Sequence, residues 1–389
     1  MMFGLIHALT FLFSALLWLL IAAWNTRAAA LGMGYAAVGA LNFTAYAAYV
    51  ASALTLGHLG DRVGFKRPLA WALVGLAIIL LSGFFWQAPW MLFISACGIN
   101  VFYGYFYPTV EGLLSRMERA EGVHPYSTTA RYSLSWSSGN VLGMVFGPWL
   151  IQNQGWLVFS GGSLLCLTGA ALLTAHRRRH GDRVLVGGRL AFRPGPDLSV
   201  SSHRLATLRL GARVALLAGS TAFFGAMLLY PKILTDAGIP LAQVGFIAAF
   251  GNLAVFVAFL VLLPARFWIG RPGLCALLGS GLLLLFGLAF FMAETPVLFA
   301  LTAALGGLAY AVPYTFALFY GLATPDADNA RQGAIHETLI GVSLGFGPLM
   351  AGALLSLGRG PGVLGALVLA LGFLSLLAQA ALLILRRSA

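Results

Sequence analysis

The chain has 389 residues, of which 60% are apolar and only 9% are charged, and its formal net charge is +12. A soluble domain carries about 25% charged residues, so this composition excludes a large soluble domain. The basic residues lie in short stretches between apolar runs, which argues against nucleic-acid binding. Three cysteines lie within apolar runs without paired spacing, so we expect no disulfide and no metal site.

Apolar runs long enough to cross a bilayer recur along the whole chain. About 30 Å of hydrocarbon requires ~20 apolar residues per helix. We place twelve spans at residues 3–24, 34–56, 68–87, 90–114, 126–151, 156–175, 211–231, 241–263, 273–293, 296–320, 334–357 and 363–385. The first run has no basic segment before it, so we interpret it as a membrane helix and not as a cleaved signal. The predicted fold class is an all-α membrane protein.

The basic residues fall mainly on one side of these spans. Twenty lysines and arginines lie on the side that holds both termini, and three lie on the other, namely Arg27, Lys232 and Arg359. Positive charge accumulates on the cytoplasmic side of membrane proteins. We therefore predict a multi-pass protein of the plasma (inner) membrane with both termini in the cytoplasm.

The chain divides into two similar halves. A polar stretch at residues 176–210 follows six spans and precedes six more, so we predict lobes at 1–175 and 211–389 with a cytoplasmic linker between them. Three pairs recur about 200 positions apart: Arg67-Pro68 with Arg271-Pro272, Ala130-Arg131 with Ala330-Arg331, and Gly147-Pro148 with Gly347-Pro348. These matches predict pseudo-symmetric lobes. The arginines at 177–179 set topology or contact anionic lipid.

The loop after the second span carries the most specific motif. It reads G-H-L-G-D-R-V-G-F-K-R-P from Gly57 to Pro68. This loop resembles the signature of the major facilitator superfamily between its second and third helices, which is G-x-x-x-D-R/K-x-G followed by basic residues. The matching residues are Gly57, Asp61, Arg62, Gly64 and Lys66, whereas Phe65 departs from the pattern. The resemblance implies two six-helix lobes that work by alternating access.

In the superfamily this loop acts as a conformational latch. The resemblance implies that Asp61 faces the positive N-terminus of the eleventh helix, which here starts near Gly333. Arg62 and Lys66 are expected to pair with acids on the fourth span or the loop after it, for which Glu111 and Glu118 are the candidates. The alternative is that these charges only set topology.

The fifth span contains small residues every four positions: Gly139, Gly143 and Gly147, followed by Pro148. Such a face allows close helix packing. The pattern is similar to the antiporter motif of exporters in the superfamily, although the usual trailing Gly-Gly is replaced by Trp149 and Leu150. Gly347-Pro348 ends a shorter copy in the eleventh span. Generic glycine packing is the alternative.

Polar and aromatic residues of four spans are candidates for a substrate cavity. Asn100, Tyr103, Tyr107 and Glu111 share one face of the fourth span. The resemblance implies a cavity lined by helices one, four, seven and ten, which adds Ser14, Trp18, Phe223, Met227, Tyr230, Tyr310 and Tyr314. This aromatic wall with few charges favours an amphipathic or neutral ligand. Helix-to-helix packing is the alternative for each residue.

Few ionisable residues lie in or near the spans, and these are functional candidates. The charge-network or proton candidates are Glu111, Arg131, Arg331, His336 and Glu337. We hypothesise that Glu111 pairs with Arg131 and that Glu337 or His336 titrates during transport. The alternative is a static charge network that closes the cytoplasmic gate.

The resulting prediction is a transporter without enzymatic activity, cofactor or metal. His336-Glu337 lacks the second histidine of a metalloprotease, and no phosphate-loop lysine motif occurs. We expect a monomer in contact with membrane lipid that exports a small amphipathic or hydrophobic compound, with protons as a candidate coupling ion. The alternatives are an uptake carrier for a sugar, metabolite or organic anion, and a non-transporting sensor or lipid-handling protein.

Overall fold

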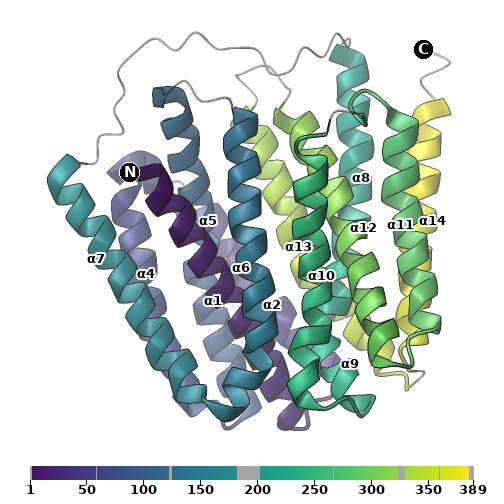
Figure 1. Cartoon of the computed structure of the whole chain (residues 1–389), viewed down its shortest axis with the longest axis horizontal. Coiled ribbons are helices and arrows are strands. Elements are labelled where there is room, and N and C mark those ends of the chain that lie inside the picture. Colours follow the sequence, from purple (N-terminus) through teal and green to yellow (C-terminus); the bar gives the residue numbers. More distant parts are fainter. Residues whose placement is uncertain are drawn as a thin grey trace. The chain divides into compact units, whose positions relative to one another are not determined.

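The computed structural model describes residues 2–57, 59–121, 125–181, 202–265, 267–322, 329–358 and 360–384. These ranges fold into long helices and short connections (Figure 1). The long helices are α1 (Met2–Ala30), α2 (Tyr35–Leu56), α4 (Lys66–Leu80), α5 (Pro89–Glu121), α6 (Pro125–Asn153), α7 (Gly162–His180), α8 (Ser202–Met227), α10 (Leu241–Leu262), α11 (Pro272–Phe291), α12 (Pro296–Leu322), α13 (Asn329–Leu355) and α14 (Gly362–Ile384). Shorter elements are α3 (Leu59–Val63), α9 (Tyr230–Asp236), a 3₁₀ turn at Leu81–Phe85 and a π-helical turn at Leu157–Gly161.

Each of the twelve predicted spans corresponds to one of these long helices, which confirms the predicted fold class. Many helix ends differ from the predicted bounds by several residues, and two of these differences change how the chain is divided. Helix covers both ends of the stretch predicted to be a linker, because α7 continues to His180 and α8 begins at Ser202. The seventh span is not one helix to residue 231, since α8 ends at Met227 and α9 starts at Tyr230 with Pro231 near its N-terminus. Proline lacks the amide hydrogen that a continuous helix needs and favours a new first turn.

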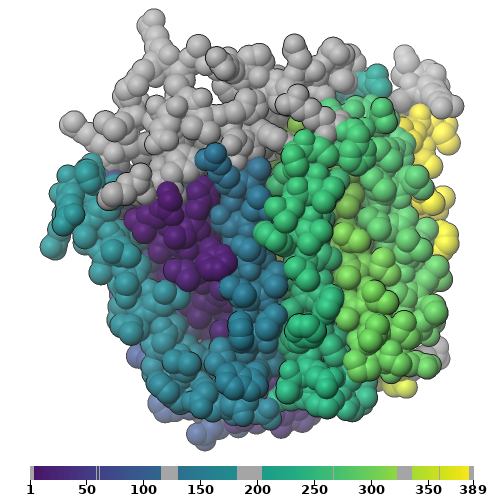
Figure 2. Space-filling model, in the orientation of Figure 1, coloured from purple at the N-terminus to yellow at the C-terminus, as the bar shows by residue number. Residues whose placement is uncertain are grey.

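Within the described residues, eleven helices are long and apolar enough to cross a membrane. The remaining long helix, α6, has a first half rich in serine and threonine, and its polar side chains Ser133 and Ser137 are buried. Other helices expose apolar side chains instead. On α10, Phe246, Leu253 and Val261 are exposed, and Figure 2 shows this helix in green at the surface of its part of the molecule. Such a surface is suited to lipid.

The chain forms two compact units. Unit 1 comprises Met1–Met33 and Leu41–Arg193, and unit 2 comprises Gly34–Ala40 and Pro194–Ala389. In unit 1, α1 packs against α6 and α4 packs against α7. In unit 2, α8 packs against α13 and α11 packs against α14, and α10 also has an extensive contact with α12. Two pairings therefore recur at equivalent places in the two units, as the half-to-half matches in the sequence predict. The change of unit after Arg193 falls inside the predicted linker at 176–210.

Candidate functional site

The substrate-cavity candidates of unit 1 meet between α1 and α5. The Ser14 hydroxyl and the Tyr107 hydroxyl lie 2.8 Å apart in a hydrogen bond. The rings of Tyr103 and Tyr107 stack at 5.9 Å with an interplanar angle of 25°. The Tyr103 hydroxyl donates to the Phe13 carbonyl at 2.9 Å. Tyr103 and Tyr107, chosen from their spacing, and Ser14, implied by the resemblance, thus form one contiguous polar and aromatic cluster.

Asn100 and Trp18 complete the unit 1 candidates. The Asn100 amide nitrogen donates to the Ala96 carbonyl one turn back, while its side-chain oxygen is buried without a hydrogen-bond partner in the described part of the chain. That oxygen is an acceptor that a ligand or water can use. Trp18 is buried, and its Cβ lies against Gly143 of α6. This contact favours the packing alternative for Trp18.

In unit 2 the candidates form a row of rings from α8 through α12 to α13. Phe223 and Tyr310 are parallel, with ring centroids 5.2 Å apart. Tyr310 and Tyr314 meet edge to face at 5.5 Å, and Tyr314 meets the His336 ring edge to face at 4.7 Å. Edge-to-face and offset arrangements at such separations are favourable for aromatic pairs. His336, predicted as a proton candidate, therefore belongs to the same cluster as the cavity candidates.

The other two candidates of unit 2, Tyr230 and Met227, make contacts with neighbouring helices. The Tyr230 hydroxyl donates to the Phe299 carbonyl at 2.7 Å, and its ring meets Phe299 edge to face at 6.1 Å. Met227 is fully buried, with its sulfur beside Gly251 of α10. Both contacts favour the packing alternative that the sequence left open.

His336 is the most unusual polar residue of this cluster. Its side chain is 3% exposed, and neither Nδ1 nor Nε2 has a hydrogen-bond partner within the residues that the structure describes. A buried donor or acceptor left without a partner costs roughly 1–3 kcal/mol. The Arg213 guanidinium on α8 acts electrostatically on this ring, and the Glu337 carboxylate acts on Tyr310. The side chain of Arg331 lies outside the described residues.

The remaining charge predictions concern α5 and α6 of unit 1. The Ser135 hydroxyl donates to the Arg131 carbonyl at 2.7 Å and lies 3.2 Å from Nδ1 of His7. Polar groups therefore gather where α6 passes α1. The expected pairing of Glu111 with Arg131 stays a prediction. The side chains of Asp61 and Glu118 lie outside the described residues, so the latch contact of Asp61 also stays a prediction.

The loop motif from Gly57 to Lys66 is held within unit 1. Gly64 has φ +84°, a conformation that favours glycine, and a Cβ at Gly57 would collide with the Ala53 carbonyl. Arg62 is exposed. Lys66 is 4% exposed, and its Nζ donates to the carbonyl of Gly181, directly after α7, at 2.7 Å. Phe65, the departure from the motif, is buried beside Gly60 and Gly112, whose missing side chains make room for its ring.

The predicted packing motif lies on α6 at its contact with α1. A Cβ at Gly139 or Gly143 would collide with the α1 carbonyls of Phe11 or Ala15, and Gly147 faces Leu19 and Ala22 in the same way. In unit 2, Gly347 lies equally close to α8. Pro148 and Pro348 lie inside their helices, and the Pro348 carbonyl lies against Gly39 of the same unit.

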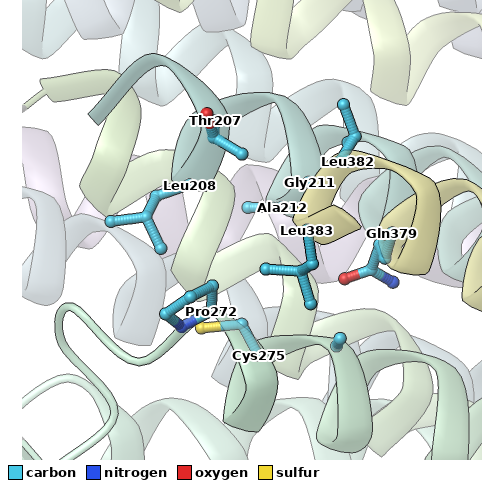
Figure 3. Close-up of a pocket in the computed structure, with 10 residues that line it drawn as sticks. Thr207, Leu208, Gly211, Ala212, Pro272, Cys275, Gln379, Leu382 and Leu383 are labelled. Atoms are coloured by element: carbon cyan, nitrogen blue, oxygen red, sulfur yellow. The ribbon is translucent and has the colours of Figure 1, made fainter. Parts of the chain in front are cut away.

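A cavity of about 20 Å³ lies between α8, α11 and α14 (Figure 3), lined by residues that include Thr207, Cys275 and Gln379. This volume suits a single water. Gln379 donates to the Ser280 hydroxyl at 2.9 Å and to the Ser375 hydroxyl at 3.2 Å. The cavity is far below the roughly 300–1,000 Å³ of a ligand site. The sequence interpretation missed this polar network because Ser280 lies about 100 positions from Ser375 and Gln379, and all three lie in apolar runs.

Known proteins resemble this chain in sequence profile and in fold. A profile of the Major Facilitator Superfamily matches residues 5–271. No curated protein sequence matches the chain. Two solved structures of the nucleoside transporter NupG are similar: a mutant form with TM-score 0.66, 14% identity and coverage of 99% of each chain, and a second with TM-score 0.64, 15% identity and coverage of 98% of each chain. A bacterial homologue of the human lysosomal transporter Spinster has TM-score 0.60 and 14% identity, and the match covers 97% of this chain and 94% of that one.

Proposed function

The chain belongs to the Major Facilitator Superfamily, and on that premise we propose that it exports a small amphipathic or hydrophobic compound by alternating access. The observation that supports this proposal is the pair of ring clusters, one in each unit. Tyr103 and Tyr107 stack in unit 1, and Phe223 and Tyr310 stack in unit 2. Aromatic surfaces with a few hydroxyl groups suit a ligand that is largely apolar and carries limited polarity.

The glycine face of α6 supports the export direction. Gly139, Gly143 and Gly147 lie directly on the α1 backbone, and their spacing is the part of the exporter motif that this chain keeps. Small residues at a helix contact permit close approach and sliding without interlocking side chains. We further propose protons as the coupling ion, because His336 and Glu337 are ionisable groups inside a helix that carries the packing motif.

Transport assays in vesicles of both orientations test the proposal. Radiolabelled benzamide, glucose and benzoate are compared in inside-out vesicles with an imposed proton gradient. We expect benzamide to accumulate in these vesicles, and we expect this accumulation to stop when the proton gradient is dissipated. Accumulation restricted to glucose or benzoate, or accumulation only in right-side-out vesicles, would contradict export of an amphipathic compound.

A matched pair of variants connects this activity to the cluster in unit 1. Tyr107→Phe removes the hydroxyl that bonds Ser14, and Tyr105→Phe removes one on another face of the same helix. We expect the first to reduce benzamide accumulation several-fold and the second to leave it unchanged. Equal effects of the two variants would show that transport does not depend on the cluster in unit 1.

The uptake alternative has one observation in its favour. The Asn100 side-chain oxygen and the Ser14 and Tyr107 hydroxyls place three polar groups on neighbouring helices, and a sugar or polar metabolite needs several such partners. Glucose uptake by right-side-out vesicles, lost in Asn100→Leu, would favour this alternative.

A further inference from the structure

We propose that the outer faces of α4 and α7 form a binding surface for a phospholipid whose headgroup carries a net negative charge, with Arg178 and Arg179 holding its phosphate. This surface lies within unit 1, and it does not depend on which compound the protein transports or in which direction. The sequence left open whether the arginines at 177–179 set topology or contact lipid. The arrangement of the two helices favours contact with lipid.

The two helices pack side by side and run in opposite directions (Figure 1). At the start of α4, the Lys66 Nζ donates to the carbonyl of Gly181, directly after α7, at 2.7 Å. Near the other end, the Ser163 hydroxyl of α7 donates to the Ala77 carbonyl of α4 at 2.8 Å. The start of α4 and the end of α7 therefore lie at the same level, on the side that the charge distribution predicts to be cytoplasmic.

The exposed face of α7 is apolar up to its last turn, where it becomes basic. Leu164, Leu167 and Leu172 are 66%, 49% and 50% exposed. Arg178 and Arg179 are exposed as well, and a rotation of about 100° per residue places both within this same face. The helix thus presents a row of apolar side chains that ends in two guanidinium groups.

The exposed face of α4 repeats this order. Arg67 is exposed, Trp71 one turn later is 52% exposed, and Val74 and Ile78 continue the face at 40% and 67%. Tryptophan is enriched at the level of the lipid headgroups. Ile78 lies about 16 Å along the helix from Arg67, close to half of the ~30 Å hydrocarbon core. Each helix therefore has the order of polarity of one phospholipid, with charge at the headgroup and apolar groups along the chains.

The charges at this end select the class of headgroup. Neither α4 nor α7 contains an acidic residue. The positive charge of Lys66 acts on the His176 ring of α7, so the basic groups of the two helices share one region. A guanidinium binds a phosphate through paired N–H donors. The ammonium of a zwitterionic headgroup would be repelled by these cations, whereas a headgroup with net negative charge is attracted by them.

The equivalent place in unit 2 lacks part of this arrangement. Arg271 precedes α11 as Arg67 precedes the apolar part of α4, and the same interval of 204 positions relates Trp71 to Cys275. Cys275 is only 5% exposed. Of these two places, only the one in unit 1 has an exposed aromatic ring below its arginine, so the basic end of unit 2 provides a matched comparison.

Lipid titration of the purified, delipidated full-length protein, followed by native mass spectrometry, tests this inference. The probes are dioleoylphosphatidylglycerol, dioleoylphosphatidylcholine with the same chains, and inorganic phosphate without chains. We expect the first molecule of phosphatidylglycerol to bind about 25-fold more tightly than phosphatidylcholine, roughly fivefold for each arginine. This preference should shrink as the ionic strength rises, because salt screens exposed charges. Inorganic phosphate should not displace the lipid, because it lacks the apolar chains.

Two double variants with the same loss of charge complete the experiment. Arg178→Gln combined with Arg179→Gln should weaken phosphatidylglycerol binding about 25-fold and leave phosphatidylcholine binding unchanged. Arg204→Gln combined with Arg271→Gln removes two exposed arginines of unit 2 and should bind both lipids as the wild type does. If the α7 double variant does not fold, its two single variants decide, each with an expected loss of roughly fivefold.

Several outcomes would overturn this inference. Equal binding of the two lipids to the wild type, or unchanged phosphatidylglycerol binding in the α7 variants, would mean that these arginines only set topology. An equal loss in the unit 2 variant would mean that any basic end attracts the lipid. Displacement by inorganic phosphate would identify a site for the free anion instead. The proposed export is measured separately and would stand after any of these results.

Discussion

The contact of α1 with α6 in unit 1 and that of α8 with α13 in unit 2 occupy equivalent places but use different chemistry. In unit 1, Gly139, Gly143 and Gly147 bring α6 directly onto the α1 backbone. In unit 2, Gly347 keeps that close approach, whereas Ser343 takes the place that corresponds to Gly143. Ser343 accepts hydrogen bonds from Ser220 at 2.7 Å and from Thr221 at 3.2 Å.

The two units repeat the same helix contact, but the side chains at that contact differ. A glycine face holds two helices through van der Waals contact along the backbone, and nothing else fits there. A hydroxyl cluster holds them through hydrogen bonds, with space for further polar residues. His336 lies two turns before Ser343 on the same helix, so α13 carries both the hydroxyl contact and the buried imidazole.

The loops after α2 and α10 differ in a similar way. Lys66 fastens the first loop through its bond to the Gly181 carbonyl. Trp268 fastens the second, because its fully buried ring contacts Phe316 at 4.7 Å and Phe319 at 5.0 Å. The charged motif that identifies the first loop is thus replaced by an aromatic anchor in the second.

The largest expected effect is at this aromatic anchor. Trp268→Ala should lower the free energy of unfolding by roughly 3–5 kcal/mol, as for a large buried aromatic side chain. Its neighbour Phe267 is 51% exposed, so Phe267→Ala is the control and should change little. Denaturant titration in detergent micelles measures both, and a small loss in Trp268→Ala would mean that the loop is held by other contacts.

The next effect is at the glycine face. Gly143→Ala places a Cβ against the backbone of Ala15 and Leu19, which has no flexible end to move away, so we expect a loss of about 1–3 kcal/mol. Gly281→Ala on α11, where no atom lies within 4 Å of the added Cβ, should be neutral or slightly stabilising. Equal melting temperatures for the two variants would contradict a distinct role for the α6 face.

A smaller effect is expected where the two loops are compared directly. Lys66→Met keeps most of the buried stem but removes the bond to Gly181, for a loss of about 1 kcal/mol. Arg204→Met removes an exposed bond to the Gly270 carbonyl and should cost less, because exposed charges contribute little. Denaturant titration measures both variants. A larger loss of unfolding free energy in Arg204→Met than in Lys66→Met would contradict this comparison.

The smallest effect concerns the hydroxyl pair between α8 and α13. A double-mutant cycle of Ser220→Ala and Ser343→Ala should give a coupling energy near ~0.6 kcal/mol, the average for hydrogen bonds between membrane helices. A coupling of zero would show that this hydroxyl pair adds nothing to the van der Waals packing, which is what holds the helices together along the glycine face of unit 1.

Much of the fold was accessible from sequence because a bilayer imposes strong constraints. The apolar runs predicted each long helix, and the recurrence of Arg-Pro and Gly-Pro pairs predicted two related halves. The bounds were wrong around residue 230, where Pro231 interrupts an apolar run that hydropathy alone cannot divide. The end of α7 was also placed too early, since its last turn is basic and composition cannot distinguish a charged helical turn from a loop.

The candidate site was only partly accessible. Helical spacing brought Tyr103 and Tyr107 together correctly, because residues four apart share a face. Spacing could not separate Tyr230 from Tyr310, since the difference lies in a backbone carbonyl that Tyr230 meets on a distant helix. Spacing also could not show that the His336 ring packs against Tyr314, and the role of His336 as a proton or charge-network residue stays a prediction.

The sequence by itself determined that this is a helical membrane protein with two related halves and a major facilitator signature at Gly57–Lys66, because hydropathy and glycine spacing are local properties. Only the tertiary structure decided which polar groups find partners. Lys66 meets the Gly181 carbonyl, Gln379 meets Ser280, and His336 is left without a hydrogen-bond partner among the described residues. The first two of these contacts join residues about 100 positions apart. Whether such a contact forms depends on how the helices cross and not on any pattern along one of them.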